Sequence, residues 1–130
     1  YMQGLNTTAA HGHGAMFGVY GMLGIGLMLF CLKGMAPHYQ WNDRWMNRAF
    51  WSLNIGLAMM IVFALLPAGL WQTYNVSQFG YWYARSAEFI HSPAMETLVW
   101  LRVPGDIVFA FGALALSIVI AGVYRGIKKA

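Results

Sequence analysis

Three long stretches of the sequence hold almost no charged residues: about 10–33, 48–73 and 97–124. Each has apolar side chains all round a helical wheel rather than on one face, which is typical of helices surrounded by lipid. An α-helix rises 1.5 Å per residue, so about 20 residues cross the ~30 Å hydrocarbon core of a bilayer. The pattern predicts an all-α integral membrane protein with three transmembrane helices in one membrane domain, residues 1–130.

The two joints between the predicted helices differ in length and character. Residues 34–47 contain Pro37, Asp43 and Arg44 and predict a short loop at the membrane surface. Residues 74–96 form a longer loop that is rich in Trp and Tyr. These aromatic side chains are typical of the headgroup region of a membrane.

The basic residues predict the orientation in the membrane. Three helices bring the 34–47 joint and the C-terminus to one side, together with six of the eight Lys and Arg residues. Because cytoplasmic loops carry an excess of Lys and Arg, this side is expected to be cytoplasmic and the 74–96 joint to face outward. The six residues are Lys33, Arg44, Arg48, Arg125, Lys128 and Lys129.

Composition supports the membrane assignment. The 130 residues are 59% hydrophobic and 9% charged, whereas soluble domains are about 25% charged, which argues against a water-soluble monomer. Eight basic residues are too few for a nucleic-acid-binding surface, so no nucleic-acid partner is expected. The single Cys31 excludes an internal disulfide. The chain begins at Tyr1 without a visible signal peptide. The absence of an initiator Met suggests a piece of a longer protein.

Two histidines lie where the first predicted helix begins, in the sequence AAHGHGAMFGVYG. On an α-helix, His11 and His13 would point about 200° apart, so they cannot share one metal ion as an i, i+4 pair can. They can instead serve two flat cofactors on opposite sides, each taking one axial imidazole. The alternative is a pair of interfacial histidines bonded to water or headgroups, although ionisable groups at membrane depth favour a function.

Three glycines follow the histidines on one helical face. Gly14, Gly18 and Gly21 fall within about 60° of one another on a helical wheel. Such a stripe allows a neighbouring helix, or the face of a porphyrin, to approach closely.

A second cluster, LRVPGDIVF, opens the third predicted helix at its outer end. Asp106 follows Arg102 by four residues, so the two can form an ion pair on one helical face. The pair has two interpretations that stay open here. It is either a salt bridge that holds two helices together, or a carboxylate that accepts hydrogen bonds from a hydroxylated ligand or passes protons outward.

The segments HGHGAMFGVYGML, FWSLNIGLAMMIVFALLP, YWYARSAEF and LRVPGD resemble, in this order, the C-terminal part of quinol-dependent nitric oxide reductases, membrane relatives of the haem-copper oxidases. The resemblance covers almost the whole chain. It implies the last three helices of a haem-copper-oxidase-like bundle in the inner (cytoplasmic) membrane of a bacterium. It also implies His11 as the proximal ligand of haem b3, His13 as an axial ligand of haem b, and Asp106, beside Arg102, as a carboxylate of the quinol pocket.

The implied reaction is the two-electron reduction of two nitric oxide molecules to nitrous oxide and water. Electrons would pass from quinol through haem b to haem b3 and a non-haem iron, which residues outside this chain would bind. The implied partners are quinol, the remaining helices of the enzyme and the lipid bilayer, and a homodimer is left open. The alternatives are a nitric oxide dismutase, a cytochrome c-dependent reductase, which should diverge around LRVPGD, and a non-catalytic membrane subunit.

Overall fold

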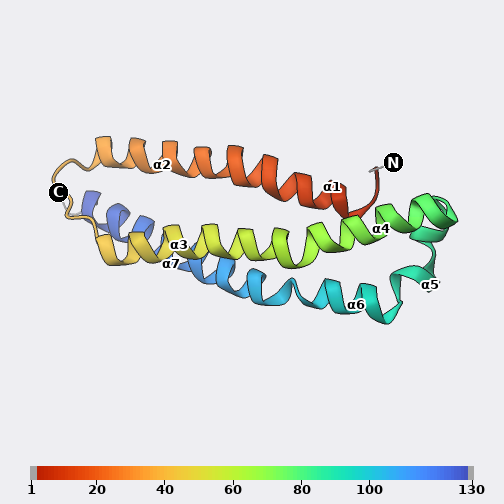
Figure 1. Ribbon diagram of the computed structural model, residues 1–130. Coiled ribbons are helices and arrows are strands. Elements are labelled where there is room, and N and C mark those ends of the chain that lie inside the picture. The colour runs from red at the N-terminus through yellow and green to blue at the C-terminus, as the bar shows by residue number, and fades with distance from the viewer. Residues whose placement is uncertain (1–2, 129–130) are drawn as a thin grey trace.

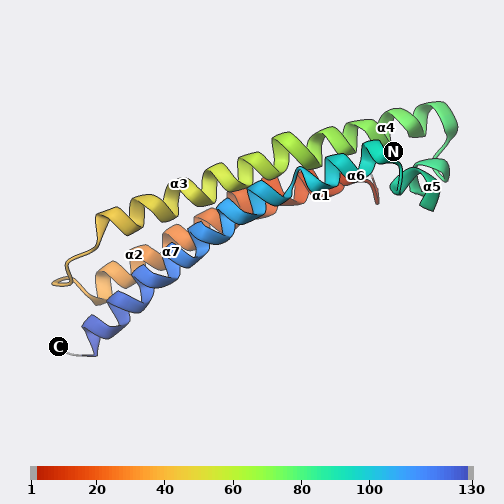
Figure 2. The same cartoon turned by 90° about the horizontal axis from the view of Figure 1, so that it is seen from below.

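The structure is a computed structural model that describes residues 3–128 and contains three long helical rods lying side by side (Figures 1 and 2). All three rods are long and apolar enough to cross a membrane, and the described residues contain no strand, which confirms the predicted all-α membrane fold. The first rod consists of α1 (Asn6–His11), the π-helix η1 (Gly12–Gly21) and α2 (Met22–Met35); the second of α3 (Asp43–Met59), the π-helix η2 (Met60–Leu65) and α4 (Leu66–Phe79); the third of α6 (Pro93–Trp100) and α7 (Val103–Ile127).

The helices extend beyond the apolar stretches at the 74–96 joint. Helix α4 continues to Phe79 and α6 begins at Pro93, with the short elements η3 (Tyr83–Arg85) and α5 (Ala87–Ile90) between them. Hydropathy marks where the hydrocarbon region ends, whereas a helix continues until its backbone pairing is interrupted. Here Gly80, with a φ of 87°, ends α4 in a conformation that glycine adopts without strain.

Two stretches wind as π-helices, η1 and η2. A π-turn pairs residue i with residue i+5 and is wider than an α-turn, and such turns are frequent at functional sites. The turns of η2 lie directly before Pro67, which has no N–H and would clash with the carbonyl of the preceding α-turn. The turns of η1 follow His11 directly and contain His13.

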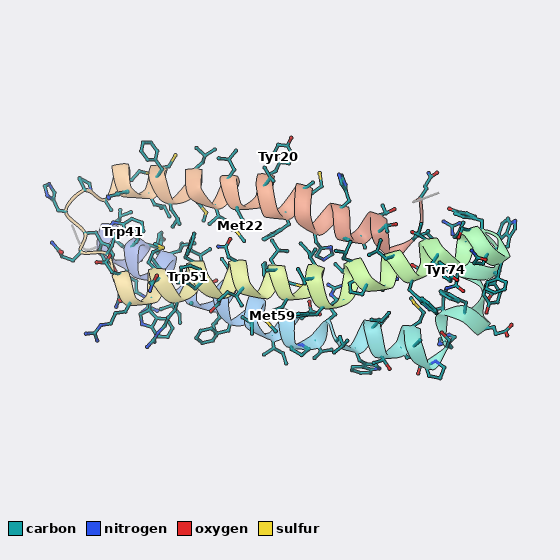
Figure 3. The ribbon with its side chains drawn as sticks, viewed as in Figure 1. Tyr20, Met22, Trp41, Trp51, Met59 and Tyr74 are labelled. Atoms are coloured by element: carbon teal, nitrogen blue, oxygen red, sulfur yellow. The ribbon has the colours of Figure 1, made fainter. Side chains whose placement is uncertain are left out.

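Helices α3 and α7 form the central packed pair. The first rod is more open: no residue of η1 or α2 is buried, and Figure 3 shows Tyr20 pointing away from the other rods while Met22 points toward them. The core between α3 and α7 consists of Ala49, Leu53, Ala115 and Leu116.

Glycines allow the second and third rods to touch backbone to backbone. A Cβ added at Gly56 would lie 2.5 Å from the backbone nitrogen of Phe109, and one at Gly105 would lie 2.8 Å from that of Met60. The glycine stripe of the first rod does not make such contacts with the described residues. At Gly14 the nearest atom to an added Cβ is a side-chain carbon of Ile61 at 3.7 Å, an ordinary van der Waals distance.

The N-terminal end of the first rod is held by a side chain from the second. The backbone N–H of Asn6, which has no partner within its own helix, donates to Oε1 of Gln72 at 2.8 Å. The Gln72 amide nitrogen donates in turn to the carbonyl oxygen of Ala84 at 3.2 Å, and the Gln72 side chain is buried. Nearby, the Arg85 guanidinium donates to the carbonyl oxygen of Gln3 at 2.8 Å.

We expect Gln72→Leu to destabilise the protein by about 1–3 kcal/mol. The substitution keeps the side-chain volume but leaves the Asn6 N–H and the Ala84 carbonyl without their partner in a buried region. The exposed Gln78 on the same helix is the matched control, and Gln78→Leu should change stability by less than about 0.5 kcal/mol. Thermal unfolding of the detergent-solubilised protein measures both, and equal losses of stability would contradict the role given to Gln72.

The basic residues gather at one end of the molecule. The joint between α2 and α3 lies against the C-terminal turns of α7, since a Cβ added at Gly126 would lie 2.5 Å from the ring of Tyr39 (Figure 1). Lys33, Arg44, Arg48, Arg125 and Lys128 belong to this end, while Lys129 lies outside the described residues. The cytoplasmic location of this end stays a prediction.

Candidate functional site

A cavity of about 610 Å³ lies where the three rods meet, near the N-terminal end of α7. Three of the residues that line it are His13, Arg102 and Asp106, which come from opposite ends of the sequence. The volume lies within the range of about 300–1,000 Å³ that is usual for ligand and cofactor sites. The structure thus brings together three of the four site residues predicted from the sequence.

His13 is held in one tautomer by the backbone of its own helix. Its Nδ1 lies 2.9 Å from the carbonyl oxygen of Ala9. A carbonyl oxygen can only accept a hydrogen bond, so Nδ1 carries the proton and Nε2 of the neutral ring keeps a free lone pair. This is the arrangement of most metal-ligating histidines, whose second nitrogen donates to a carbonyl or a carboxylate. The residues present therefore fit an axial imidazole ligand at His13.

His11 has different surroundings from His13. Its side chain is exposed, and it is not among the residues that line the cavity. The step from His11 to His13 leaves α1 and enters η1, whose wider turns rotate less than an α-helix does for each residue. The rotation about the rod axis from His11 to His13 is therefore somewhat less than the 200° of an α-helix, and the two residues still lie on roughly opposite sides of the rod. The role of His11 as a haem ligand stays a prediction.

No cluster of three or more His, Cys, Asp or Glu side chains that could hold a metal ion occurs within residues 3–128. A haem does not need such a cluster. A single imidazole is what a haem iron takes from one helix.

Arg102 and Asp106 form the predicted ion pair. The Arg102 Nε donates to Oδ1 of Asp106 at 3.1 Å, and the two side chains are 39% and 44% exposed. Arg102 is the residue before α7, and Asp106 lies in its first turn, where a carboxylate interacts favourably with the helix dipole. The pair joins two residues of the same helical turn, so it does not link two helices. This leaves a carboxylate that a ligand in the cavity can reach.

The rest of the cavity wall is apolar. Phe17 and Phe109 meet edge to face with their ring centroids 5.2 Å apart, and Leu57 and Met60 of the second rod are buried beside them. These residues were not singled out from the sequence. Their spacing was the available signal, because Phe17 follows His13 by four residues and Phe109 follows Asp106 by three, which places each on the helical face of a site residue.

A comparison with protein families agrees with the membrane fold. The family model described as cytochrome C and quinol oxidase polypeptide I matches residues 1–108, which include both histidines and the Arg102–Asp106 pair. The search of curated proteins found no match.

Proposed function

This chain belongs to the cytochrome c and quinol oxidase polypeptide I family, and on that premise we propose that it is the part of a quinol-dependent nitric oxide reductase that holds one side of each haem. The family consists of haem-binding membrane oxidoreductases, so the chain is a multi-pass, haem-copper-oxidase-like membrane subunit. The assignment to a quinol-dependent nitric oxide reductase is supported by the cavity that His13 and the Arg102–Asp106 pair line together. A haem ligand and a carboxylate suited to a hydroxylated donor are thereby neighbours.

The histidines have the first role in this proposal. His13 would coordinate the iron of haem b through Nε2, while its Nδ1–H stays bonded to the Ala9 carbonyl and fixes the plane of the ring. His11, two residues earlier, would be the proximal ligand of haem b3. A bound haem would supply a reversible one-electron carrier. The apolar wall formed by Phe17, Phe109 and Met60 would keep water away from it.

Asp106 has the second role, at the quinol. Arg102 occupies Oδ1, so Oδ2 is the oxygen available to accept a hydrogen bond from a quinol hydroxyl. A carboxylate in this position can also take up the proton that the hydroxyl releases on oxidation. Each quinol gives two electrons and two protons, and two nitric oxide molecules consume the same number to form one nitrous oxide and one water. The non-haem iron would be bound by residues outside this chain.

We expect Asp106→Ala to lower kcat/KM with quinol by about 100-fold, the usual effect of losing a general base. Turnover with an artificial donor that reduces the haem directly should fall far less. Glu88→Ala is the matched control, because Glu88 is an exposed carboxylate at the same end that does not line the cavity. The measurement is nitric oxide consumption by the purified holoenzyme with each donor, and equal losses with both donors would contradict a quinol-specific role.

The products of the same assay separate the proposed activity from its alternatives. One nitrous oxide for each quinol oxidised is the expected result. Dinitrogen and dioxygen without quinol oxidation would instead identify a nitric oxide dismutase. A purified complex with no visible absorption from b-type haem would overturn the enzymatic proposal and leave a non-catalytic membrane subunit.

A further inference from the structure

A second pocket lies at the opposite end of the molecule from the His13 cavity, where the joint between α2 and α3 folds against α7. Its volume is about 340 Å³. Tyr39, Asn42, Trp45 and Arg125 form its polar wall, and residues of α7 between 118 and 122 form its apolar wall. The pocket therefore has a hydrogen-bonding side at the helix ends and a hydrocarbon side along a membrane-spanning helix.

The charge at this end is strongly positive. Of the four acidic residues in the chain only Asp43 lies here, while Glu88, Glu96 and Asp106 belong to the other end. Arg125 makes no hydrogen bond or ion pair with the described residues, so its guanidinium is available to a ligand. The five described basic residues of this end are Lys33, Arg44, Arg48, Arg125 and Lys128.

The walls of the pocket are fixed by contacts within the protein. The side-chain oxygen of Asn42 accepts a hydrogen bond from the backbone N–H of Trp45 at 3.2 Å and caps the start of α3. The Arg48 guanidinium lies 5.0 Å from the centroid of a Trp45 ring, which brings a second positive charge beside the pocket. The ring of Tyr39 rests on the glycines of α7, at Gly122 and Gly126. The site is thus formed before a ligand enters.

We propose that this pocket binds an anionic phospholipid, with the Arg125 guanidinium on its phosphate. Guanidinium groups bind phosphate oxygens through paired hydrogen bonds, and the Tyr39 hydroxyl and the Asn42 amide add further polar groups at the headgroup level. The apolar side chains of α7 then contact the acyl chains. Basic pockets between membrane helices are known to recognise lipid headgroups in this way. The proposal does not depend on the haem and quinol assignments.

The test uses the purified holoenzyme, stripped of lipid in detergent and titrated with phosphatidylglycerol, phosphatidylcholine or inorganic phosphate, with native mass spectrometry to count bound lipid. Phosphatidylglycerol should bind more tightly than phosphatidylcholine, and Arg125→Gln should weaken its binding about fivefold. Lys128→Gln is the matched control, since it removes the same charge from the same end but does not line the pocket. It should change the affinity less than twofold.

A second variant tests the pocket without changing its charge. Ala121→Phe places a large side chain in the pocket and should abolish the lipid binding that depends on Arg125, while the variant stays folded by size-exclusion chromatography. Equal losses with Arg125→Gln and Lys128→Gln would mean diffuse attraction rather than a site, and would overturn the proposal. Equal binding of the two phospholipids, unchanged binding in Ala121→Phe, or displacement of the lipid by inorganic phosphate would overturn it as well.

Discussion

Replacing His13 with Ala is expected to remove low-spin haem b from the purified enzyme while haem b3 stays at least partly bound. In the structure, His13 is the residue with a free imidazole nitrogen in the cavity, and its ring is oriented by the Ala9 carbonyl. Even the loss of a partner that only orients a metal ligand lowers metal affinity about 10- to 100-fold. Removal of the ligand itself should therefore lower haem b occupancy at least about tenfold.

The visible absorption spectrum and the extracted haem content measure this effect. His38→Ala is the matched control, because His38 is an exposed residue of the joint at the opposite end and should leave both haems in place. His11→Ala should show the converse pattern, with loss of haem b3 and retention of haem b. If both haems were retained in His13→Ala, or lost equally from both variants, the ligand assignment would be wrong.

Gly56→Leu is expected to prevent the second and third rods from packing and to give little or no folded protein. An added Cβ at this position would lie 2.5 Å from the backbone nitrogen of Phe109 and 2.8 Å from its Cα, so the contact can be relieved only if α3 and α7 separate. Gly56→Ala, with one extra carbon, should cost about 1–3 kcal/mol, as overpacking of a core usually does.

Thermal unfolding and size-exclusion chromatography in detergent measure the effect at Gly56. Gly34 provides the control, since no atom lies within 4 Å of a Cβ added there. Gly34→Ala and Gly34→Leu should leave the protein monodisperse. Wild-type stability in Gly56→Leu would show that the two rods do not touch as described, and the cavity that they border would then need a different shape.

The three helices could be predicted from the sequence because lipid imposes a simple rule. A segment that crosses the hydrocarbon core must be apolar all round and must pair its own backbone groups, so length and hydropathy are sufficient to find it. The ends of the helices could not be found in this way. Residues up to Phe79 remain helical outside the apolar stretch, and only the conformation of Gly80 ends them.

The site was predictable in part. His13, Arg102 and Asp106 could be singled out because an ionisable side chain in an apolar stretch is costly and needs a reason to be there. That they line one cavity depends on how the first and third rods lie against η2, and no pattern within a single sequence gives this arrangement. The tautomer of His13 likewise depends on the position of the Ala9 carbonyl.

The glycines show the same limit. Spacing marked Gly14, Gly18 and Gly21 as a face for close approach, whereas the structure has its close backbone contacts at Gly56, Gly69, Gly105 and Gly112. A row of small residues on one helical face permits another backbone to come close. It does not predict that a second backbone lies there, because that depends on the residues of the neighbouring helix.

The winding of η1 has a consequence for which changes the first rod can tolerate. Each of its ten residues turns the chain less about the rod axis than a residue of α2 does. The histidines before and within η1 therefore point in a different direction, relative to the residues of α2, than they would on a continuous α-helix. Exchanging one apolar side chain for another between Met16 and Gly21 preserves this direction. Inserting or deleting a single residue there would turn His13 about the rod axis, away from Phe109 and Asp106. In this segment, length matters more than composition.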